Sequence, residues 1–387
     1  MKAAIFGVRD AEYVKKEIES DANSNLDIVY FVDNNKKLWG TFFPLGDNTK
    51  IKIISFQELE KKYKSGAIEV VLVAVRNGYN RWFITNQLQK AGIDKIGLVK
   101  PSVITYQWSM KFYNNNQRKC CSNQIVWVDE IQKPIIHYLE IHAMDSCNLN
   151  CKGCLHFSNL YYHDEKPDLN RLIKDVQQLS DNCYILHLRV LGGEPLLNPN
   201  LDILLEGLRG VLPDTDIGVV TNGTLIPKQD KKLFQIMKRN EIGFNITLYP
   251  PTHKMKDEIY TILNENKVSY GSHLAKVNEF SKNLMIEPNL GVITSHTKCV
   301  SKNCFFLREG KLYKCAPAAL INRFYETYGL PVRMNAGINI YDSEIKWEQE
   351  LSGMYEKPTE LCKYCSDSLV NYSWAVANPP KMEDWII

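Results

Sequence analysis

The sequence predicts an α/β protein in three parts: an N-terminal domain on an open parallel sheet, a partial (β/α)6 barrel, and a loop-rich, cysteine-rich C-terminal domain. Short apolar runs alternate with helical segments through residues 1–100 and again through 136–290, a pattern typical of parallel sheets covered by helices. Nine of the 11 cysteines follow residue 146. The chemistry is therefore expected in the second half of the chain.

The N-terminal pattern contains five apolar runs. Strands are predicted at residues 2–6, 26–32, 51–54, 69–75 and 96–99, and helices at 11–20, 56–63 and 80–91. The β-branched run at 69–75 suits a strand buried on both faces. Residues 101–135 are irregular and are interpreted as a linker.

The second pattern repeats at the pitch of a (β/α) barrel. Strands are predicted at residues 136–141, 185–191, 216–221 and 243–248, and helices at 168–179, 201–212, 229–240 and 254–265. Residues 291–370 then form a loop-rich domain with few periodic runs, and residues 371–387 a tail.

Composition excludes several classes of function. The chain has 47 basic and 44 acidic residues and a net charge of +3, so nothing favours a nucleic-acid or membrane partner. No apolar run approaches the roughly 18 residues of a membrane-spanning helix, and charge follows the first strand too soon for a signal peptide. We therefore expect a cytoplasmic protein, in which cysteines favour metal ligation over disulfides.

Three cysteines lie close together directly after the strand at 136–141. Cys147, Cys151 and Cys154 have the spacing C-x3-C-x2-C. A structural zinc ion takes four protein ligands, and a [4Fe–4S] cube usually takes four thiolates. Three thiolates would leave one iron of a cube open to a small molecule, and barrel active sites lie on loops after strands. The alternatives are a zinc knuckle or plain buried cysteines.

This motif after the first strand of a barrel resembles the radical S-adenosylmethionine (SAM) superfamily. The segment 191–195, Leu-Gly-Gly-Glu-Pro, is similar to the GGEP motif of the family, and the segments 221–223 and 245–249 lie at the next two strand ends. The resemblance implies that the following residues bind SAM: Gly192, Gly193, Glu194, Thr221, Asn222, Asn245 and Thr247.

Two positions depart from the family pattern. The family usually has an aromatic residue just before the third cysteine, where this chain has Gly153. Phe157 or His156 is expected to pack against the adenine instead. The fourth strand also lacks the acidic residue that is often seen there.

The resemblance implies a reaction class. One electron, supplied by a reductase, flavodoxin or ferredoxin, would reduce the open-site [4Fe–4S] cluster and cleave SAM to methionine and a 5′-deoxyadenosyl radical. That radical would abstract hydrogen from an unreactive C–H bond of a small molecule, while the protein orients the reactants and excludes water.

A second set of cysteines follows the barrel. Cys299, Cys315, Cys362 and Cys365 have spacings that resemble the SPASM and shorter twitch domains appended to radical SAM barrels. Four thiolates satisfy one auxiliary [4Fe–4S] cluster; a zinc site is the alternative. Residues 310–315 are predicted as part of a hairpin. Cys304 either replaces Cys299 as a ligand, is a candidate hydrogen donor to the substrate, or is an inert buried thiol.

The N-terminal domain resembles Rossmann-like domains that precede sugar-modifying enzymes of bacterial surface-polysaccharide pathways. Its first turn lacks G-x-G-x-x-G, which disfavours NAD. Gly7 and Arg9 are candidates to bind a phosphate, and Asp33 to bind a ribose hydroxyl. The alternative is a scaffold that binds no nucleotide.

Together these features predict a radical SAM oxidoreductase or epimerase acting on a carbohydrate-type substrate, such as a sugar nucleotide or a surface-polysaccharide precursor. A peptide-modifying radical SAM enzyme is the alternative, although residues 1–100 show no pattern for leader-peptide recognition. A non-catalytic module that binds a metal and a nucleotide is a more remote alternative.

Overall fold

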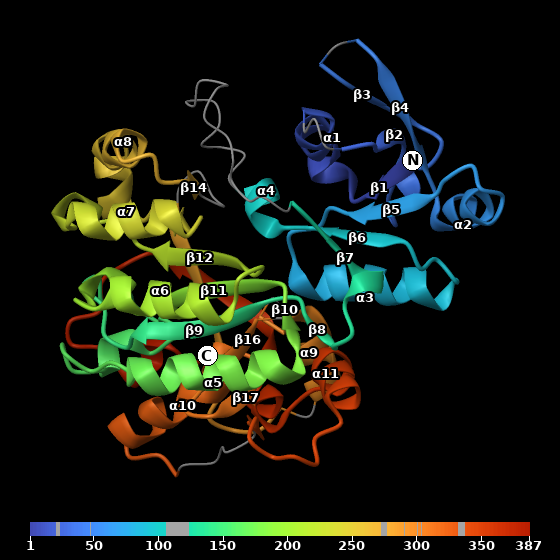
Figure 1. The fold of residues 1–387 in the computed structure, drawn as a ribbon. Coiled ribbons are helices and arrows are strands. Elements are labelled where there is room, and N and C mark those ends of the chain that lie inside the picture. The colour runs from blue at the N-terminus through green and yellow to red at the C-terminus, as the bar shows by residue number, and fades with distance from the viewer. Residues whose placement is uncertain are drawn as a thin grey trace. The chain divides into compact units, whose positions relative to one another are not determined.

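The computed structural model describes residues 1–20, 24–46, 48–105, 124–271, 277–289, 291–299, 301–302, 304–331 and 337–387. The chain divides into two compact units, Met1–Lys133 and Pro134–Ile387, each of which is built on its own sheet (Figure 1).

The first unit has a seven-stranded sheet in the order β3-β4-β2-β1-β5-β6-β7. Its strands are β1 (Lys2–Phe6), β2 (Asp27–Val32), β3 (Phe42–Pro44), β4 (Lys50–Ile54), β5 (Val70–Val73), β6 (Ile96–Val99) and β7 (Ile125–Trp127). The five predicted strands form its parallel centre. The two edge strands, β3 and β7, run antiparallel and were not predicted, because three residues are too few to show a period.

The helices of this unit are α1 (Ala11–Ser20), α2 (Phe56–Lys64), α3 (Gly78–Lys90) and α4 (Pro101–Thr105). Ser55 and Asn77 begin α2 and α3, because their side chains accept backbone N–H groups of the first turn. The predicted linker therefore contributes a helix and a sheet strand, α4 and β7, to the first unit. Its residues 106–123 lie outside the described residues.

The second unit has an eight-stranded sheet in the order β14-β13-β12-β11-β9-β16-β17-β18. The six strands from β14 to β16 are parallel, which fits an open, partial barrel. Its strands are β9 (Leu139–Met144), β11 (His187–Gly192), β12 (Asp216–Thr221), β13 (Gly243–Ile246), β14 (Tyr270–Gly271), β16 (Phe305–Arg308), β17 (Lys311–Tyr313) and β18 (Ile338–Asn339).

Two predicted strands are interrupted. The run predicted at 136–141 forms β8 (Ile135–Ile136) and β9, and the run at 185–191 forms β10 (Tyr184–Ile185) and β11. The short β8 and β10 pair with each other outside the main sheet. The main strand β9 ends at Met144, which is three residues before the first cysteine of the motif.

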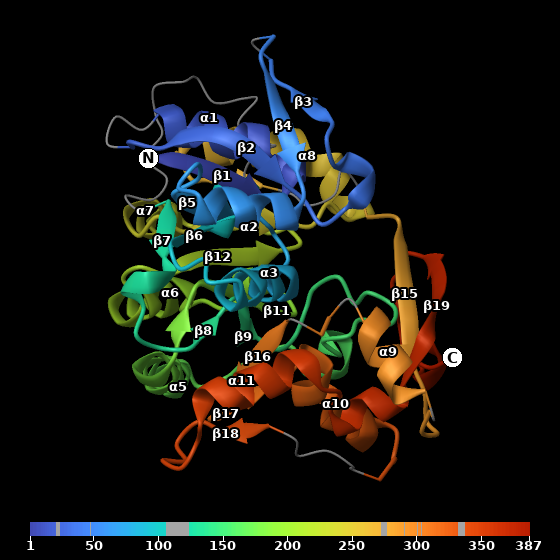
Figure 2. The same cartoon turned by 90° about the vertical axis from the view of Figure 1, so that its right-hand side faces the viewer.

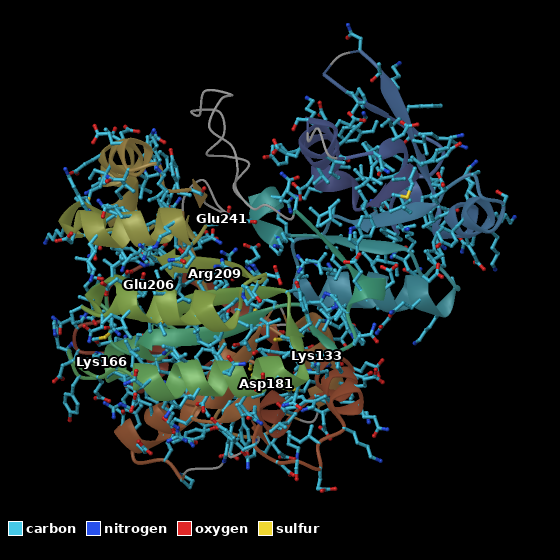
Figure 3. All side chains as sticks on the ribbon, viewed as in Figure 1. Lys133, Lys166, Asp181, Glu206, Arg209 and Glu241 are labelled. Atoms are coloured by element: carbon cyan, nitrogen blue, oxygen red, sulfur yellow. The ribbon has the colours of Figure 1, made fainter. Side chains whose placement is uncertain are left out.

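Helices cover the outer face of the parallel strands. They are α5 (Leu169–Asn182), α6 (Leu201–Val211), α7 (Lys231–Arg239) and α8 (Pro250–Glu265), and α5, α6 and α7 lie side by side in chain order (Figure 1). Figure 3 shows Glu206 and Arg209 on α6. Glu206 pairs with Arg239 of α7, and Arg209 donates to the carbonyls of 212, 213 and 215 that follow the helix.

The cysteine-rich segment 291–370 continues the barrel sheet, since β16 lies parallel to β9. It also contains three helices that the loop-rich prediction missed: α9 (Val292–Lys298), α10 (Ala316–Thr327) and α11 (Trp347–Glu356). β16 and β17 form the predicted hairpin, whose turn places Glu309 and Gly310 in the left-handed region.

The predicted tail, residues 371–387, is packed into the second unit. β19 (Cys365–Ser373) pairs antiparallel with β15 (Glu279–Leu284), as Figure 2 shows. Trp385 is fully buried in an apolar cluster with Phe157 and Phe324. Among the described residues, no helix combines the length and apolar character needed to cross a membrane.

Candidate active site

The three motif cysteines come from one loop at the carboxyl end of β9. Asn150 and Gly153 turn this loop with positive φ angles of 47° and 62°. A cavity of about 710 Å³ opens beside it, and Cys154 lies on its wall. The structure therefore brings the motif to a cavity at the strand ends, where barrel enzymes hold their substrates.

The motif thiols are close enough to affect one another. Burial raises the pKa of Cys147 and of Cys151 to about 12, and neighbouring motif thiols add to both shifts. Such buried thiols stay protonated without a metal and release their protons when they ligate one. Across the described residues, no three His, Cys, Asp or Glu side chains gather tightly enough for a single ion. Three thiols on one loop are the donor set that would hold a [4Fe–4S] cluster and leave one iron without a protein ligand.

The Gly-Gly-Glu-Pro segment packs against the motif loop. A side chain on Gly192 would place its Cβ 2.0 Å from the Met144 carbonyl oxygen, and one on Gly193 would lie 2.1 Å from that of Ser146. Only glycine fits at these two positions. Both glycines thus serve the contact between β11 and the loop, a role that the sequence prediction did not include.

Glu194 is fully buried and accepts hydrogen bonds from the end of the next strand, β12. Its carboxylate accepts the Thr221 hydroxyl at 2.7 Å and the Asn222 backbone N–H at 2.8 Å. Burial raises the pKa of this carboxyl to about 7, although these hydrogen bonds favour the ionised form. Glu194 therefore connects two of the predicted SAM-binding segments, and its contact with the SAM amino group stays a prediction.

Asn222 reaches back to the motif. Its side-chain amide donates to Asn148 at 2.8 Å and lies 3.8 Å from the Cys147 sulfur.

Asn245 is buried on β13, and the Thr247 backbone N–H donates to the Thr221 carbonyl. From this strand end, Tyr249 lines the cavity. The structure thus brings Glu194, Thr221 and Asn222 to the motif loop, and Tyr249 is a residue that the sequence prediction did not select.

Phe157 does not line the cavity. It is fully buried and packs against Phe324 and Trp385, with ring centroids 5.7 and 6.0 Å away. Its ring therefore belongs to the apolar core of this structure, and packing of Phe157 against the adenine stays a prediction. His156, the other candidate, does line the cavity.

His156 ends a buried chain of polar groups that the sequence did not reveal. Its Nδ1 lies 2.9 Å from His142 Nε2, and His142 Nδ1 lies 2.7 Å from Asp145. Arg308 donates to both carboxylate oxygens of Asp145. Burial alone would raise the pKa of Asp145, but hydrogen bonds from His142 and Arg308 hold it well below its usual value. These hydrogen-bonded groups fix the orientation of the His156 side chain, which lies beside Cys154 on the cavity wall.

The second set of cysteines also converges. Burial raises the pKa of Cys315 to about 12, with further contributions from Cys299 and Cys362. Burial and the same neighbours raise the pKa of Cys365 well above its usual value. Cys299 directly follows α9, and Cys315 follows the β16–β17 hairpin. Cys362 lies just before β19, and Cys365 is the first residue of that strand. The folded chain therefore gathers cysteines that lie up to 66 positions apart in the sequence.

Cys304 lies on the cavity wall and interacts with thiols of this set. It lines the cavity together with Cys299 and Glu140. Burial raises the pKa of the Cys304 thiol well above its usual value, and Glu140, Cys315 and Cys299 add to the shift. A thiol that stays protonated at a cavity wall retains the hydrogen that a donor needs.

The N-terminal candidates are engaged with one another. The Gly7 backbone N–H donates to the Val32 carbonyl, and the Val8 N–H lies 3.3 Å from the Asp33 carboxylate, which also accepts from Asn35. The amides that a phosphate would use at this turn are thus paired within the protein, whereas Arg9 is exposed. These contacts favour the scaffold alternative, and nucleotide binding by Gly7, Arg9 and Asp33 stays a prediction.

Comparison with known proteins identifies one part of the chain. Residues 141–284 match the model of the radical SAM superfamily. The GTP 3′,8-cyclase of Thermodesulfovibrio yellowstonii is 35% identical over 114 residues, which are 28% of this chain and 35% of the relative. The GTP 3′,8-cyclase of Staphylococcus epidermidis is 28% identical over 174 residues, which are 43% of this chain and 47% of the relative. The chain thus spans between a third and a half of these relatives.

Several solved structures match part of the chain, with TM-scores below 0.5. BtrN in complex with AdoMet and 2-DOIA is 18% identical, with a TM-score of 0.37, and the match covers 62% of this chain and 98% of BtrN. The family match begins on β9 and ends on β15, and it includes all three motif cysteines, Glu194 and Asn222. Members of this family use a [4Fe–4S] cluster and SAM. Residues 141–284 are therefore a radical SAM domain.

Proposed function

We propose that this chain is a radical SAM enzyme that removes hydrogen from a hydroxyl-bearing carbon of a carbohydrate-type substrate. The observation that carries the proposal is the shared cavity. Its walls include Cys154 from the motif loop, Cys299 from the second set and the separate thiol of Cys304. A substrate held there would lie between a radical-generating site and a second redox or hydrogen-donating site.

The chain's own residues would hold both groups. Cys147, Cys151 and Cys154 would ligate the open-site cluster, and Glu194 and Asn222 would position SAM at the neighbouring strand ends. When bound, the cluster and SAM supply hydrogen-atom abstraction. Cys299, Cys315, Cys362 and Cys365 would hold an auxiliary cluster, and the buried walls would exclude water.

The cavity wall carries several polar side chains that could bind the hydroxyl groups of a small molecule. Glu140, His156, Lys298 and Asp367 lie on the wall and offer both donors and acceptors to hydroxyl groups. A nucleotide sugar is the carbohydrate that we favour, since a nucleotide is also the substrate in the name of the matched cyclases.

Deuterium transfer tests the proposal. Anaerobically reconstituted chain would be reduced and incubated with SAM and nucleotide sugars deuterated at each ring carbon. We expect deuterium in 5′-deoxyadenosine from one ring position. Deuterium transfer only from GTP, or only from a peptide library, would contradict the carbohydrate substrate and favour a cyclase or a peptide-modifying enzyme.

Substitution of Cys304 distinguishes the two carbohydrate reactions, epimerisation and dehydrogenation. In an epimerase that draws its hydrogen from this thiol, Cys304→Ala would abolish the epimer and leave 5′-deoxyadenosine formation intact. In a dehydrogenase, the same variant would keep the ketone product. Substrate-derived product analysis by mass spectrometry distinguishes the two results.

A further inference from the structure

The end of the chain forms an edge on the motif loop. Beyond β19, Val376 makes an antiparallel bridge with Cys151, a predicted cluster ligand. Two backbone hydrogen bonds flank the bridge: Lys152 N–H donates to the Ala375 carbonyl (2.8 Å), and Ala377 N–H donates to the Asn150 carbonyl (2.9 Å). These residues lie about 90 positions beyond residue 284, where the family match ends, so the match assigns them no role.

Two aromatic side chains of the same segment hold the loop at other points. The Tyr372 hydroxyl donates to the Lys152 carbonyl at 2.7 Å, and Trp385 Nε1 donates to the Cys154 carbonyl at 2.8 Å. Together with the bridge, these contacts engage the loop from Asn150 to Cys154. The loop geometry therefore depends on the C-terminal segment.

The glycine at position 153 lies directly against the C-terminal segment. A side chain at Gly153 would place its Cβ 2.2 Å from the Tyr372 hydroxyl and 2.5 Å from the Asp384 carbonyl oxygen. The Tyr372 side chain could move aside, but the backbone at Asp384 could not move without displacing the buried Trp385. Glycine before the third cysteine thus leaves room for the C-terminal segment.

Trp374 makes the contact with direct chemical consequence. Its indole Nε1–H donates to the Cys151 sulfur at 3.1 Å. The ring stacks on Tyr249 at 6.0 Å between centroids, and the Trp374 backbone N–H donates to the Asn278 carbonyl at 2.7 Å. Two neighbours other than the sulfur therefore fix the indole, so the N–H is positioned before any cluster binds.

We propose that Trp374 is a positioning residue of the open-site cluster, whose indole N–H stabilises the thiolate of Cys151 and raises the reduction potential of the cluster. Reduction adds negative charge that spreads onto the ligating sulfurs, and a hydrogen-bond donor on a sulfur stabilises that charge. The proposal rests on the proposed function, because it requires that Cys151 be a cluster ligand.

The test measures a potential in the full chain. Trp374→Phe keeps an aromatic ring on Tyr249 and removes the N–H. Tyr372→Phe is the matched control, since it removes one hydrogen bond from the same C-terminal segment to the same loop without touching a sulfur. The open-site cluster is identified as the one whose electron paramagnetic resonance signal changes when SAM is added. Its midpoint is then measured by reductive titration, with iron content determined in parallel.

We expect the Trp374→Phe midpoint to shift to a more negative potential, with iron content and the Tyr372→Phe midpoint as in wild type. Loss of the SAM-responsive cluster in Trp374→Phe alone would also support the contact. An unchanged midpoint, or equal effects in the two variants, would overturn it. A wild-type chain without any SAM-responsive signal would instead refute the proposed function on which the inference rests.

Discussion

The two units show how similar sheets can serve different purposes. Both have a parallel centre, and in both the polar residues gather where strands end. In the first unit these groups pair with one another: Val8 and Asp33 by a hydrogen bond, and Asp10 and Arg76 by an ion pair at 2.6 Å. In the second unit, the corresponding edge carries sulfur and opens on a cavity. The sheet alone therefore does not identify a site; the residues that follow its strands do.

Glycine illustrates the same point. A Cβ on Gly7 would lie 2.7 Å from the Ala74 carbonyl oxygen, and one on Gly192 would lie 2.0 Å from that of Met144. Both glycines thus permit close backbone packing at a strand end, although only the second stands beside the cysteine motif. A glycine after a strand is weak evidence for a ligand, whereas three spaced cysteines are strong evidence.

Removing the motif should have the largest effect. We expect Cys151→Ala to reduce SAM cleavage to background and to lower the iron content by about four atoms per chain, since two thiolates cannot hold a stable cube. Cys183→Ala is the control, because Cys183 is buried outside both cysteine sets. Iron and 5′-deoxyadenosine assays check both variants. Wild-type cleavage by Cys151→Ala would show that the strand ends of the second unit are no more catalytic than those of the first.

Removing a ligand of the second set should reduce product formation while SAM cleavage continues. In Cys315→Ala we expect the auxiliary iron to be lost and substrate-derived product to fall at least about 100-fold, while SAM cleavage persists. Chromatography of 5′-deoxyadenosine and of the product checks this. Equal loss of both would mean that the second set supports the fold of the domain rather than a later step.

The first unit should respond only in stability. Asp10 is buried and pairs with Arg76 through two hydrogen bonds. Truncation to Ala leaves the guanidinium without this partner, which costs about 3 kcal/mol for a buried pair. Hydrogen exchange of β1 and β5 amides should then quicken by about 100-fold, with iron content unchanged. A matching loss of iron would reveal a dependence of the second unit on the first.

The sequence predicts the parts of the site that are local. The cysteine spacing, Glu194 and the Asn222 turn each lie within a few residues of a strand end, so periodicity and motif locate them together. The second cysteine set was also selected from its spacing. For the first site the necessary information lies in short stretches of chain, whereas the second set spans 66 positions and was selected because its spacings resemble those of a known type of domain.

What the sequence does not predict depends on distant contacts. Trp374 donates to a sulfur 223 positions away, and nothing near residue 374 marks that partner. Phe157 follows the motif as an adenine contact would, yet Phe324 and Trp385 bury it. Residues 371–387 likewise have distant partners, since they contribute to the pairing with β15 and with the motif loop.

Two buried carboxyl groups provide the finest comparison between the units. Asp10 forms an ion pair with Arg76. Glu140 on β9 accepts a hydrogen bond from the Tyr138 hydroxyl at 2.9 Å and also interacts with the charge of Arg189. Burial raises the pKa of Glu140 to about 7 from an ordinary value near 4.5. Folding therefore favours its protonated form, and the stability from this group is present below pH 4.5 and declines as the pH rises through 7.

The expected decline is about 2 kcal/mol between pH 5 and pH 7. Glu140→Gln cannot ionise and should lack this part of the pH dependence. Protection of β9 and β11 amides against hydrogen exchange, compared between wild type and variant at each pH, measures the difference. Parallel pH profiles would show that Glu140 is ionised in the folded protein. The carboxyl groups at the two sheets would then differ in their partners but not in their charge.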